Sequence, residues 1–241
     1  MKRCSASIGL STLSVVSNVW LLTDAEGRRF LIDTGVRAER SAIMSSLHRA
    51  GIRNPGDLTA VLLTHRHCDH AGNAAWIRDQ LGCPIVCHAY DARVLRGDVS
   101  TPSLQRGIGS FFDKVCCAVE DRFSVRLPID EELGLGAWRY GFEIIPAFGH
   151  TEGSILIYHA PTGTLFTGDA LLTCVPPLRT HEKFGLAIPA YSIDAEMCHA
   201  HTLAFLRKPP LVHQLCAGHG PFVGKRAARK LAAFLDAMAP A

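Results

Sequence analysis

The sequence predicts an α/β protein in which two β-sheets stack face to face and helices cover their outer faces. Short apolar runs typical of buried strands alternate with segments of helical spacing, once in residues 15–96 and again in residues 137–238. No long Gly/Ser-rich or Pro-rich linker separates the two halves. We therefore expect a single domain over residues 1–241.

The first half is expected to open with a hairpin and to continue with regular alternation. Val15–Leu22 and Arg29–Ile32 have the composition of strands, and the turn Asp24–Gly27 joins them. The elements expected next are a helix at Glu39–Ala50, a strand at Ala60–Leu63, a helix at Gly72–Leu81, a strand at Pro84–His88 and a helix at Ala89–Arg96.

An amphipathic helix at Thr101–Phe123, started by Pro102-Ser103, is expected between the two halves. Ordinary packing is the simpler explanation of its apolar stripe, and a roof over a substrate pocket is the alternative. The stretch Leu171–Pro189 is expected to be irregular. The other predicted elements are strands at Trp138–Pro146, Ser154–His159, Thr164–Thr167 and Leu211–Cys216 and helices at Asp194–Leu206 and Lys225–Met238.

Composition favours an ordinary globular protein that acts on small molecules. Hydrophobic residues make up 48% of the chain and charged residues 20%, and a net charge of +3 is too small to favour a nucleic-acid partner. No apolar run approaches the ~20 residues needed to cross a bilayer, and no clean signal-peptide cleavage site follows the N-terminus. We expect a soluble protein with a small-molecule substrate and without a nucleic-acid or membrane partner. The oligomeric state is open, with a homodimer as one alternative.

The nine cysteines favour a cytoplasmic location. Their odd number and irregular spacing are typical of reduced thiols rather than of a disulfide framework. Cys83, Cys87 and the pair Cys116-Cys117 lie in apolar surroundings, where they are expected to pack in the core.

The densest group of metal-binding side chains is the stretch from His65 to His70, with the sequence His-Arg-His-Cys-Asp-His. It follows the buried strand predicted at Ala60–Leu63, so it lies where a strand ends and a loop begins. Neutral imidazole and carboxylate are preferred ligands of divalent cations, and His65 and His67 point the same way in an extended segment. Cys68 either contacts this site or, as we expect, fills space behind it.

Three further candidate ligands follow other predicted strands. They are His150, Asp169 and His219, each with glycine directly before it. Strand ends are where open α/β folds concentrate functional residues. Together with the first cluster they make five histidines and two aspartates, which suit two metal ions with open positions for water and substrate.

The order of these motifs resembles the signature of the metallo-β-lactamase superfamily. The motifs are Asp33, the cluster His65–His70, His150 in Phe148–Ser154, Asp169 in Phe166–Ala170 and His219 in Ala217–Gly220. The resemblance spans nearly the whole chain. It implies a four-layer αββα sandwich with the metal ions at one edge of the two sheets.

The resemblance also implies a role for each motif residue. His65, His67 and His150 would bind the first ion, Asp69, His70 and His219 the second, and Asp169 would bridge both. Asp33 would accept a hydrogen bond that orients the ligand loop. The simpler structural role for Asp33 is to cap the strand before it.

Two divalent ions would share one water and lower its pKa towards roughly 7. Zinc is the first candidate, with iron or manganese as alternatives. The bridging hydroxide would attack the substrate while a metal ion stabilises the developing charge. Asp69 is the expected catalytic side chain, because it would orient the nucleophile and pass a proton to the leaving group.

Departures from subfamily patterns narrow the chemistry. A bridging Asp169 disfavours a true β-lactamase, and His67 disfavours the flavodiiron oxidoreductases, which have an acidic residue at that position. The glyoxalase II type resembles the first cluster, but its last histidine is followed by Glu-Tyr, whereas Gly220 and Pro221 follow His219 here. The ribonuclease Z type would show a second histidine motif that we do not find.

The predicted function is therefore a dinuclear hydrolase of a small-molecule ester, thioester or lactone, close to the glyoxalase II and lactonase branch. A mononuclear iron persulfide dioxygenase shares the first cluster and remains the alternative. A phosphodiesterase or nuclease is a weaker alternative, because the chain has no basic stripe.

Four polar residues in or beside the irregular stretch are candidates for substrate binding. They are Arg179, His181, Lys183 and Tyr191. Tyr191 would donate a hydrogen bond to a substrate carbonyl, and Arg179 and Lys183 would suit an anionic substrate. A packing tyrosine and a solvated loop are the structural alternatives.

Overall fold

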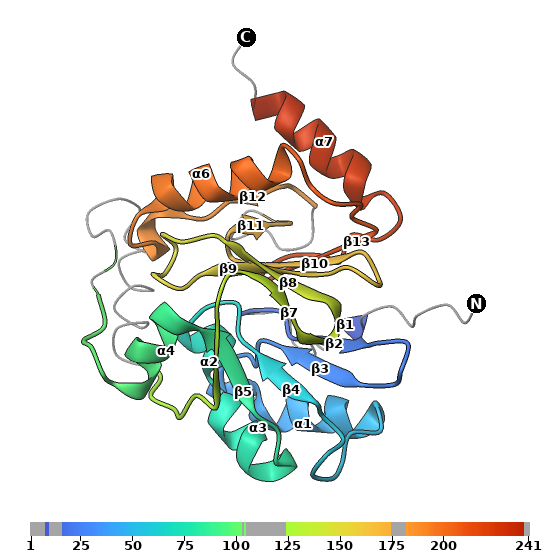
Figure 1. Ribbon diagram of the computed structural model, residues 1–241, viewed down its shortest axis with the longest axis vertical. Helices are drawn as coiled ribbons and strands as arrows, with labels where there is room; N and C mark the ends of the chain where they lie inside the picture. Colours follow the sequence, from blue (N-terminus) through green and yellow to red (C-terminus); the bar gives the residue numbers. More distant parts are fainter. Residues whose placement is uncertain (1–7, 10–15, 103, 105–123, 175–181, 239–241) are drawn as a thin grey trace.

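The computed structural model describes residues 8–9, 16–102, 104, 124–174 and 182–238, and within them two sheets stack between layers of helices (Figure 1). The first sheet has the order β1 (Ile8–Gly9), β2 (Trp20–Thr23), β3 (Arg29–Ile32), β4 (Ala60–Leu62), β5 (Ile85–His88) and β6 (Glu131–Leu133). The second has the order β13 (Gln214–Ala217), β10 (Thr164–Gly168), β9 (Ile155–His159), β8 (Phe142–Pro146) and β7 (Gly136–Trp138).

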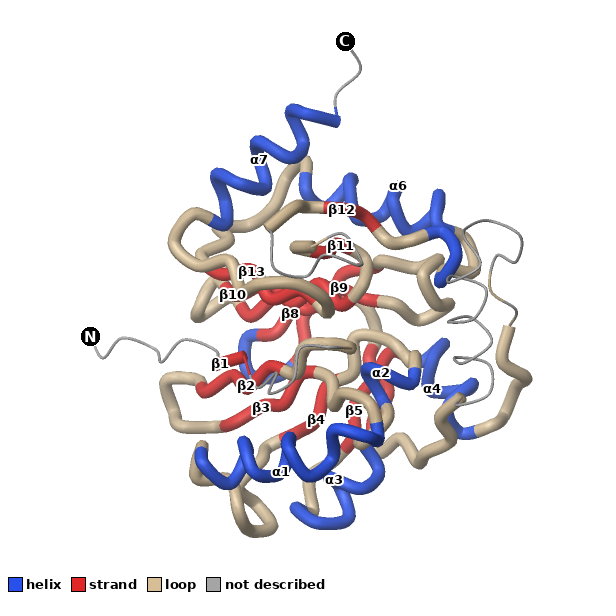
Figure 2. Tube along the Cα trace, turned by 180° about the vertical axis from the view of Figure 1, so that it is seen from behind, coloured by secondary structure: helices blue, strands red, loops and turns tan. Residues whose placement is uncertain are grey.

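Helices cover the outer face of each sheet, as the reverse view in Figure 2 also shows. The helices α1 (Arg40–Arg49) and α3 (Ala74–Leu81) lie on the first sheet, and α6 (Ala195–Leu206) and α7 (Ala227–Met238) on the second. Two further helices, α2 (Cys68–Ala71) and α4 (Ala89–Arg96), follow β4 and β5. The layers are therefore helix, sheet, sheet and helix, as the sequence predicts.

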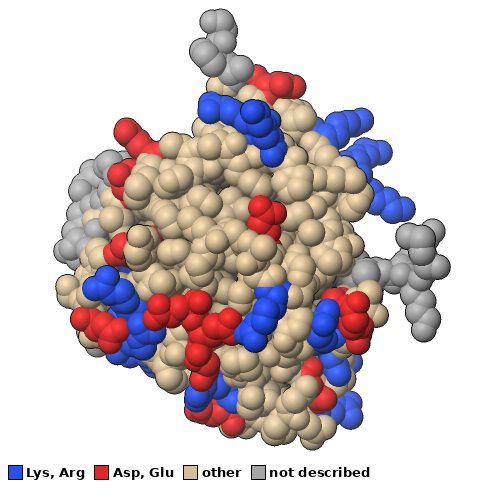
Figure 3. All heavy atoms as spheres, viewed as in Figure 1, with Lys and Arg blue, Asp and Glu red and all other residues tan. Residues whose placement is uncertain are grey.

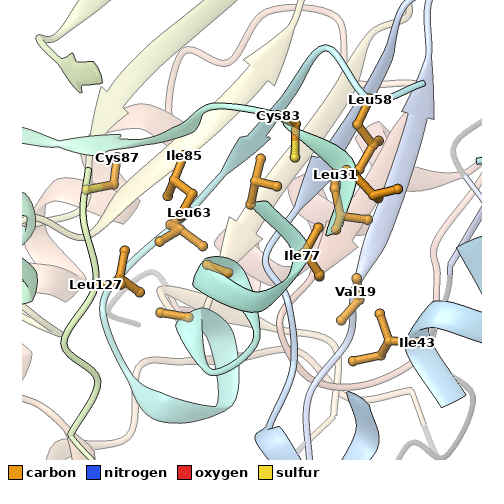
Figure 4. Close-up of a cluster of buried hydrophobic side chains, with 14 of the residues drawn as sticks. Val19, Leu31, Ile43, Leu58, Leu63, Ile77, Cys83, Ile85, Cys87 and Leu127 are labelled. Atoms are coloured by element: carbon orange, nitrogen blue, oxygen red, sulfur yellow. The ribbon is translucent and has the colours of Figure 1, made fainter. Parts of the chain in front are cut away.

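The central strands of each sheet are buried on both faces, which explains why β4, β5 and β9 are nearly continuous apolar runs rather than alternating ones. In β3, Leu31 packs towards α1 and α3, whereas Phe30 and Ile32 enter the core between the sheets. In β9, Leu156 belongs to the core under α6 and α7, while Ile157 again faces the other sheet. Figure 4 shows the first of these cores, where Leu31 and Ile85 of the sheet meet Ile43 and Ile77 of the helices.

Strand directions bring the ends that precede the candidate ligands to one edge. The parallel neighbours β3 and β4 end just before Asp33 and the His65–His70 cluster. In the second sheet, the parallel neighbours β10 and β13 end just before Asp169 and His219, and β9, antiparallel to β10, begins beside that end. A backbone hydrogen bond from Ile155 N–H to Thr64 O, 3.0 Å long, joins the two sheets there.

The strand predicted over Trp138–Pro146 is confirmed only over Phe142–Pro146, which is β8. The chain reverses at a 3₁₀ turn over Arg139–Gly141, so that β7 and β8 pair as an antiparallel hairpin. Tyr140 has φ 62° and Gly141 φ 80°, and a strand cannot pass through two consecutive residues in this left-handed region. The sequence does not reveal this turn, because the aromatic residues Trp138, Tyr140 and Phe142 all favour strands and Gly141 is the single turn signal among them.

Other elements differ from the prediction mainly at their ends. The helix predicted over Gly72–Leu81 is α3 and begins at Ala74, and the separate short helix α2 within the His65–His70 cluster is missing from the prediction. The last strand begins at Gln214 instead of Leu211. The stretch predicted to be irregular contains a short strand pair, β11 (Leu171–Leu172) with β12 (Gly185–Leu186). The strand β6 is missing from the prediction, since its two glutamates mask it.

Three remaining expectations concern the helix between the two halves, the cysteines and membrane-spanning helices. Of the helix predicted over Thr101–Phe123, residues 103 and 105–123 lie outside the described residues, as do Cys116 and Cys117. Cys83 and Cys87 are buried in the core of the first sheet, as expected. Among the described residues, no helix combines the length and apolar character that spanning a membrane requires.

Charged side chains mix over much of the face seen in Figure 3. Acidic and basic groups lie side by side over the helices of the first sheet, and basic groups gather around α7. On this face the charges therefore do not form a single-sign stripe across the two sheets.

Candidate metal centre

The loops at the shared edge bring seven side chains from four segments together. Each segment follows or precedes a buried strand, which fixes where its backbone leaves the sheet. Ligand atoms lie within 4.8 Å of one another in three overlapping groups, namely His65, His67 and His150; His65, His70 and Asp169; and Asp69, His70 and His219. The seven residues that the sequence motifs single out thus meet in space.

The imidazoles of the first group face one another closely. The ring centroids of His67 and His150 are 4.6 Å apart, and those of His65 and His150 are 4.7 Å apart. All three residues are at most 3% exposed. Such packing is expected when the rings converge on a common point.

Asp169 lies between the groups. Its carboxylate oxygens are 3.3 Å from His70 Nε2, 3.2 Å from His219 Nε2 and 3.7 Å from His150 Nε2. Asp69 also approaches two members of the last group, with Oδ2 3.3 Å from His219 Nε2 and 3.5 Å from His70 Nε2. One carboxylate therefore reaches both ends of the cluster, and the other reaches only one end.

Buried polar atoms without a hydrogen-bond partner provide the test for a metal ion. Among the described residues, Nε2 of His65, His67, His70 and His150 and Oδ1 of Asp169 have no such partner. Buried polar groups in native proteins are normally paired, so five unpaired atoms aimed at one place indicate a missing partner. Imidazole nitrogen and carboxylate oxygen are the donor set that Zn²⁺, Fe²⁺ and Mn²⁺ accept.

Neighbouring groups place the ring protons so that two of these nitrogens keep a lone pair. The Thr64 hydroxyl donates to Asp33 Oδ2 at 2.7 Å and therefore accepts from His65 Nδ1 at 3.1 Å. Likewise the Ser192 hydroxyl donates to Ile188 O and accepts from His150 Nδ1 at 3.1 Å. With the proton held on Nδ1, Nε2 is free to bind a metal ion.

Electrostatics divides the cluster into a neutral part and an acidic part. Burial lowers the pKa of His65 and His67 well below the ordinary value, and neighbouring imidazoles add to the effect. Burial also lowers the pKa of His150, to about 4, although the Asp169 carboxylate opposes it. These three rings are therefore neutral at physiological pH, as metal ligands must be.

In the acidic part, burial disfavours the charged form of each residue, but the attraction between the carboxylates and the protonated imidazoles outweighs this effect. Burial lowers the pKa of His70, yet Asp69, Asp169 and Asp33 outweigh it and raise this pKa well above its usual range. Burial also opposes protonation of His219, but Asp169 raises its pKa to about 9. The carboxyl of Asp169, despite burial, has a pKa well below its usual range because of His219 and His70. This end holds excess negative charge that a cation would compensate.

Asp33 fixes the orientation of His70 and of the strand end before His65. Its Oδ2 accepts from His70 Nδ1 at 2.8 Å, and its Oδ1 accepts from Thr64 N–H at 2.8 Å. The residue is 1% exposed and has φ 60°, a conformation that aspartate tolerates better than most residues.

A buried ion cluster beside the site escaped the sequence prediction. The Arg66 guanidinium is 3.2 Å from Glu152 Oε2 and 3.8 Å from Asp91 Oδ1. Asp91 in turn accepts from the Thr151 hydroxyl at 2.7 Å and from Gly153 N–H at 2.9 Å. The cluster ties the loop of His65–His67 to the loop of His150, and burial raises the pKa of Asp91 to about 6.

Of the four candidate substrate residues, the structure describes Lys183 and Tyr191. Arg179 and His181 lie outside the described residues, and Lys183 is exposed. Tyr191 is half-buried in a 3₁₀ turn at Pro189–Tyr191, where it packs against Leu104 and Ala190. Its neighbour Ser192, which the sequence did not single out, is the residue that contacts His150. Cys68 packs against the core under the first sheet.

Comparison with known proteins identifies the family. Residues 14–219 match the family model described as the metallo-beta-lactamase superfamily, so the chain belongs to this superfamily. It is a metal-dependent hydrolase, and the predicted αββα fold is confirmed.

Three relatives illustrate the match. The chain is 25% identical over 209 residues to the probable metallo-hydrolase YybB of Bacillus subtilis, covering 86% of this chain and 82% of that protein. It is 28% identical over 201 residues to a hydroxyacylglutathione hydrolase of Pseudomonas entomophila, covering 78% and 64%. The solved structure of TTHA1623 in a di-iron-bound form shares the fold, with a TM-score of 0.62, 23% identity and coverage of 94% and 97%.

Proposed function

We propose that the protein is a dinuclear hydrolase of a small-molecule ester, thioester or lactone. His65, His67 and His150 would hold the first ion, and Asp69, His70 and His219 the second. Asp169 would contribute to both positions. Zinc is our first candidate for the metal, with iron or manganese as alternatives.

The position of Asp169 is the observation that carries this proposal. Its two oxygens lie 3.2 Å from His219 Nε2 and 3.7 Å from His150 Nε2, so the same carboxylate approaches one histidine of each group. A single tetrahedral ion needs four ligands, whereas seven donors converge here. Two ions with a shared carboxylate use all seven and leave positions for water and substrate.

When bound, the ions would supply Lewis acidity, which brings the pKa of water towards roughly 7 and polarises the substrate carbonyl. The protein's own groups do the rest. The Asp69 carboxylate has a lowered pKa because His70 and His219 outweigh the effect of its burial. It is therefore ionised at neutral pH, can accept a proton from the attacking water and can return that proton to the leaving group.

The similar proteins support an acyl substrate, and one sequence departure bears on the rest of that substrate. The relatives include hydroxyacylglutathione hydrolases of Pseudomonas entomophila and Cereibacter sphaeroides, each 28% identical, and an acyl group on the glutathione sulfur is a thioester. The chain departs from the glyoxalase II motif at Gly220-Pro221, which favours a different group beyond the reacting carbonyl. Tyr191 and Lys183 would contact that group, together with Arg179 and His181.

The experiment that tests the function is a panel of ester, thioester, lactone, phosphodiester and β-lactam substrates, assayed with the metal-loaded enzyme under anaerobic conditions. We expect turnover of at least one of the first three classes without oxygen. Oxygen consumption with glutathione persulfide, without anaerobic hydrolysis, would replace our proposal with an iron dioxygenase. Turnover of the phosphodiester alone would replace it with a nuclease-like activity.

A further inference from the structure

The segment just before β2 lies between the two loops that carry Asp69 and His219. Ser17 and Asn18 are 3% and 5% exposed. Both side chains are uncharged, and neither residue is among the seven proposed metal ligands. The Ser17 hydroxyl donates to the backbone oxygen of Asp69. Asn18 contacts the other loop. One short segment thus touches ligand loops that originate from different sheets.

Asn18 uses every hydrogen-bond donor it has on the loop Ala217–Gly220. Its backbone N–H donates to Gly218 O at 2.7 Å, and its side-chain amide donates to Ala217 O at 3.0 Å and to Gly220 O at 2.7 Å. The indole N–H of Trp20 adds a second donor to Ala217 O, at 3.0 Å. These bonds fix the peptide groups on both sides of His219.

The loop has no room to shift. A Cβ atom at Gly218 would overlap Asp169 Oδ1 and would lie 2.7 Å from His70 Cε1. On its other side, the backbone oxygen of His219 accepts from Thr173 N–H at 3.1 Å. Because the loop is pressed against the ligands, a small displacement would change the distance between His219 and Asp69.

The first ligand group is held by different residues. Thr64 and Ser192 orient the rings of His65 and His150, and the Arg66–Asp91 contact links their loops. In the part of the chain that the structure describes, the hydrogen bonds of Asn18 go to the His219 loop instead. The two ends of the site are therefore braced separately.

We propose that Asn18 is a positioning residue for the second ion: it holds the His219 loop against Asp69 and so sets the affinity of that position relative to the first. The inference rests on the dinuclear function proposed above. It assigns to Asn18 no contact with substrate or metal.

Metal titration of the apo-protein tests this inference without an activity assay. Zn²⁺ binding by calorimetry and the visible absorption of bound Co²⁺ are measured for the full-length wild type and for Asn18→Ala. We expect wild type to bind two equivalents. In Asn18→Ala the affinity for the first ion stays the same, and the affinity for the second ion falls by about 10–100-fold, as it does when other residues that orient metal ligands are lost.

Three further variants separate positioning from stability and volume. Leu47→Ala removes a buried side chain from the core under α1 and, like Asn18→Ala, should lower the free energy of unfolding. It should leave the affinities for both metal equivalents unchanged. Asn18→Asp keeps the volume but loses the amide donors, so it should weaken the second equivalent at least as much as Asn18→Ala does. Trp20→Phe removes one of the two donors to Ala217 O and should weaken binding of the second equivalent less than Asn18→Ala does. If Asn18→Ala does not fold, Trp20→Phe provides the test.

The outcomes are distinct. If Asn18→Ala and Asn18→Asp bind both equivalents as tightly as wild type does, the role of Asn18 is refuted while the dinuclear site stands. Equal weakening of both equivalents would also refute it, because the effect would then be general. If wild type itself binds a single equivalent, the dinuclear function and the inference fail together.

Discussion

His70 Nδ1 lies 2.8 Å from Asp33 Oδ2, and both side chains are almost completely inaccessible to solvent. This hydrogen bond places the ring proton on Nδ1 and turns Nε2 towards Asp69 and Asp169. Asp33 also accepts both donors of Thr64, the residue that precedes His65. A residue outside the ligand set thus orients the strand end from which the first ligands emerge.

Replacing Asp33 by Asn should weaken metal binding by about 10–100-fold. Asparagine tolerates φ 60°, so the backbone stays, but its amide NH₂ must face a donor from Thr64 or His70. Metal affinity measured by competition with a chelator dye checks this. Asp24→Asn is the matched control: Asp24 is a buried aspartate that accepts two backbone N–H groups in the distant turn, and this variant should keep wild-type affinity.

The Asp69→Ala variant should fold and should lose about 10²–10⁴-fold in turnover, because the proton acceptor and a ligand are both removed. Steady-state kinetics with the best substrate of the panel, together with circular dichroism, measures the effect. The control Asp79→Ala changes an aspartate whose side chain is 67% exposed on α3 and should have no effect. Wild-type turnover in Asp69→Ala would contradict the proposed role.

Replacement of Arg66 by Met should destabilise the fold by about 3–5 kcal/mol, since it leaves the buried Asp91 carboxylate without its cation. Urea denaturation followed by tryptophan fluorescence gives the free energy of unfolding. The exposed Arg93→Met substitution on α4 should change this free energy by less than about 0.5 kcal/mol. If Arg66→Met lowers the free energy of unfolding by an equally small amount, the cluster of Arg66, Asp91 and Glu152 contributes little to the stability of the fold.

The pH dependence of stability should reveal Asp91. Its pKa is raised from 3.8 to about 6 by burial, so the folded state binds a proton that the unfolded state has released. The stabilisation from this group is complete below about pH 4 and disappears as the pH rises through 6. The free energy of unfolding of wild type minus that of Asp91→Asn should therefore fall between pH 4 and 7 in the apo-protein. A difference that is constant over this range would show that Asp91 does not titrate as described.

The ligand residues are predictable from sequence because each is encoded locally. A histidine or aspartate beside glycine at the end of an apolar run marks a strand end, and the fold brings those ends to one edge. His150, Asp169 and His219 could therefore be singled out before their neighbours were known. The residues that orient them could not be, since Thr64, Ser192 and Asn18 have ordinary side chains whose role depends on contacts with distant segments.

The fold shows the same division. Strands and helices with strong periodicity, such as Arg29–Ile32 and Ala89–Arg96, agree with the sequence prediction to the residue. The turn that separates β7 from β8 does not, because its conformation at Tyr140 depends on tertiary packing. His159 Nε2 contacts Tyr140 O at 3.1 Å, and Arg28 lies over the Tyr140 ring. Short-range propensity contains none of this information.

Metal stoichiometry measured against turnover tests the central claim most directly. Apo-protein prepared by chelation is titrated with Zn²⁺, Fe²⁺ or Mn²⁺ while bound metal and hydrolysis are followed in the same samples. Our account predicts that activity is absent in the apo-protein and reaches its maximum at about two equivalents for the native metal. Full activity at one equivalent, with no further change at two, would contradict it.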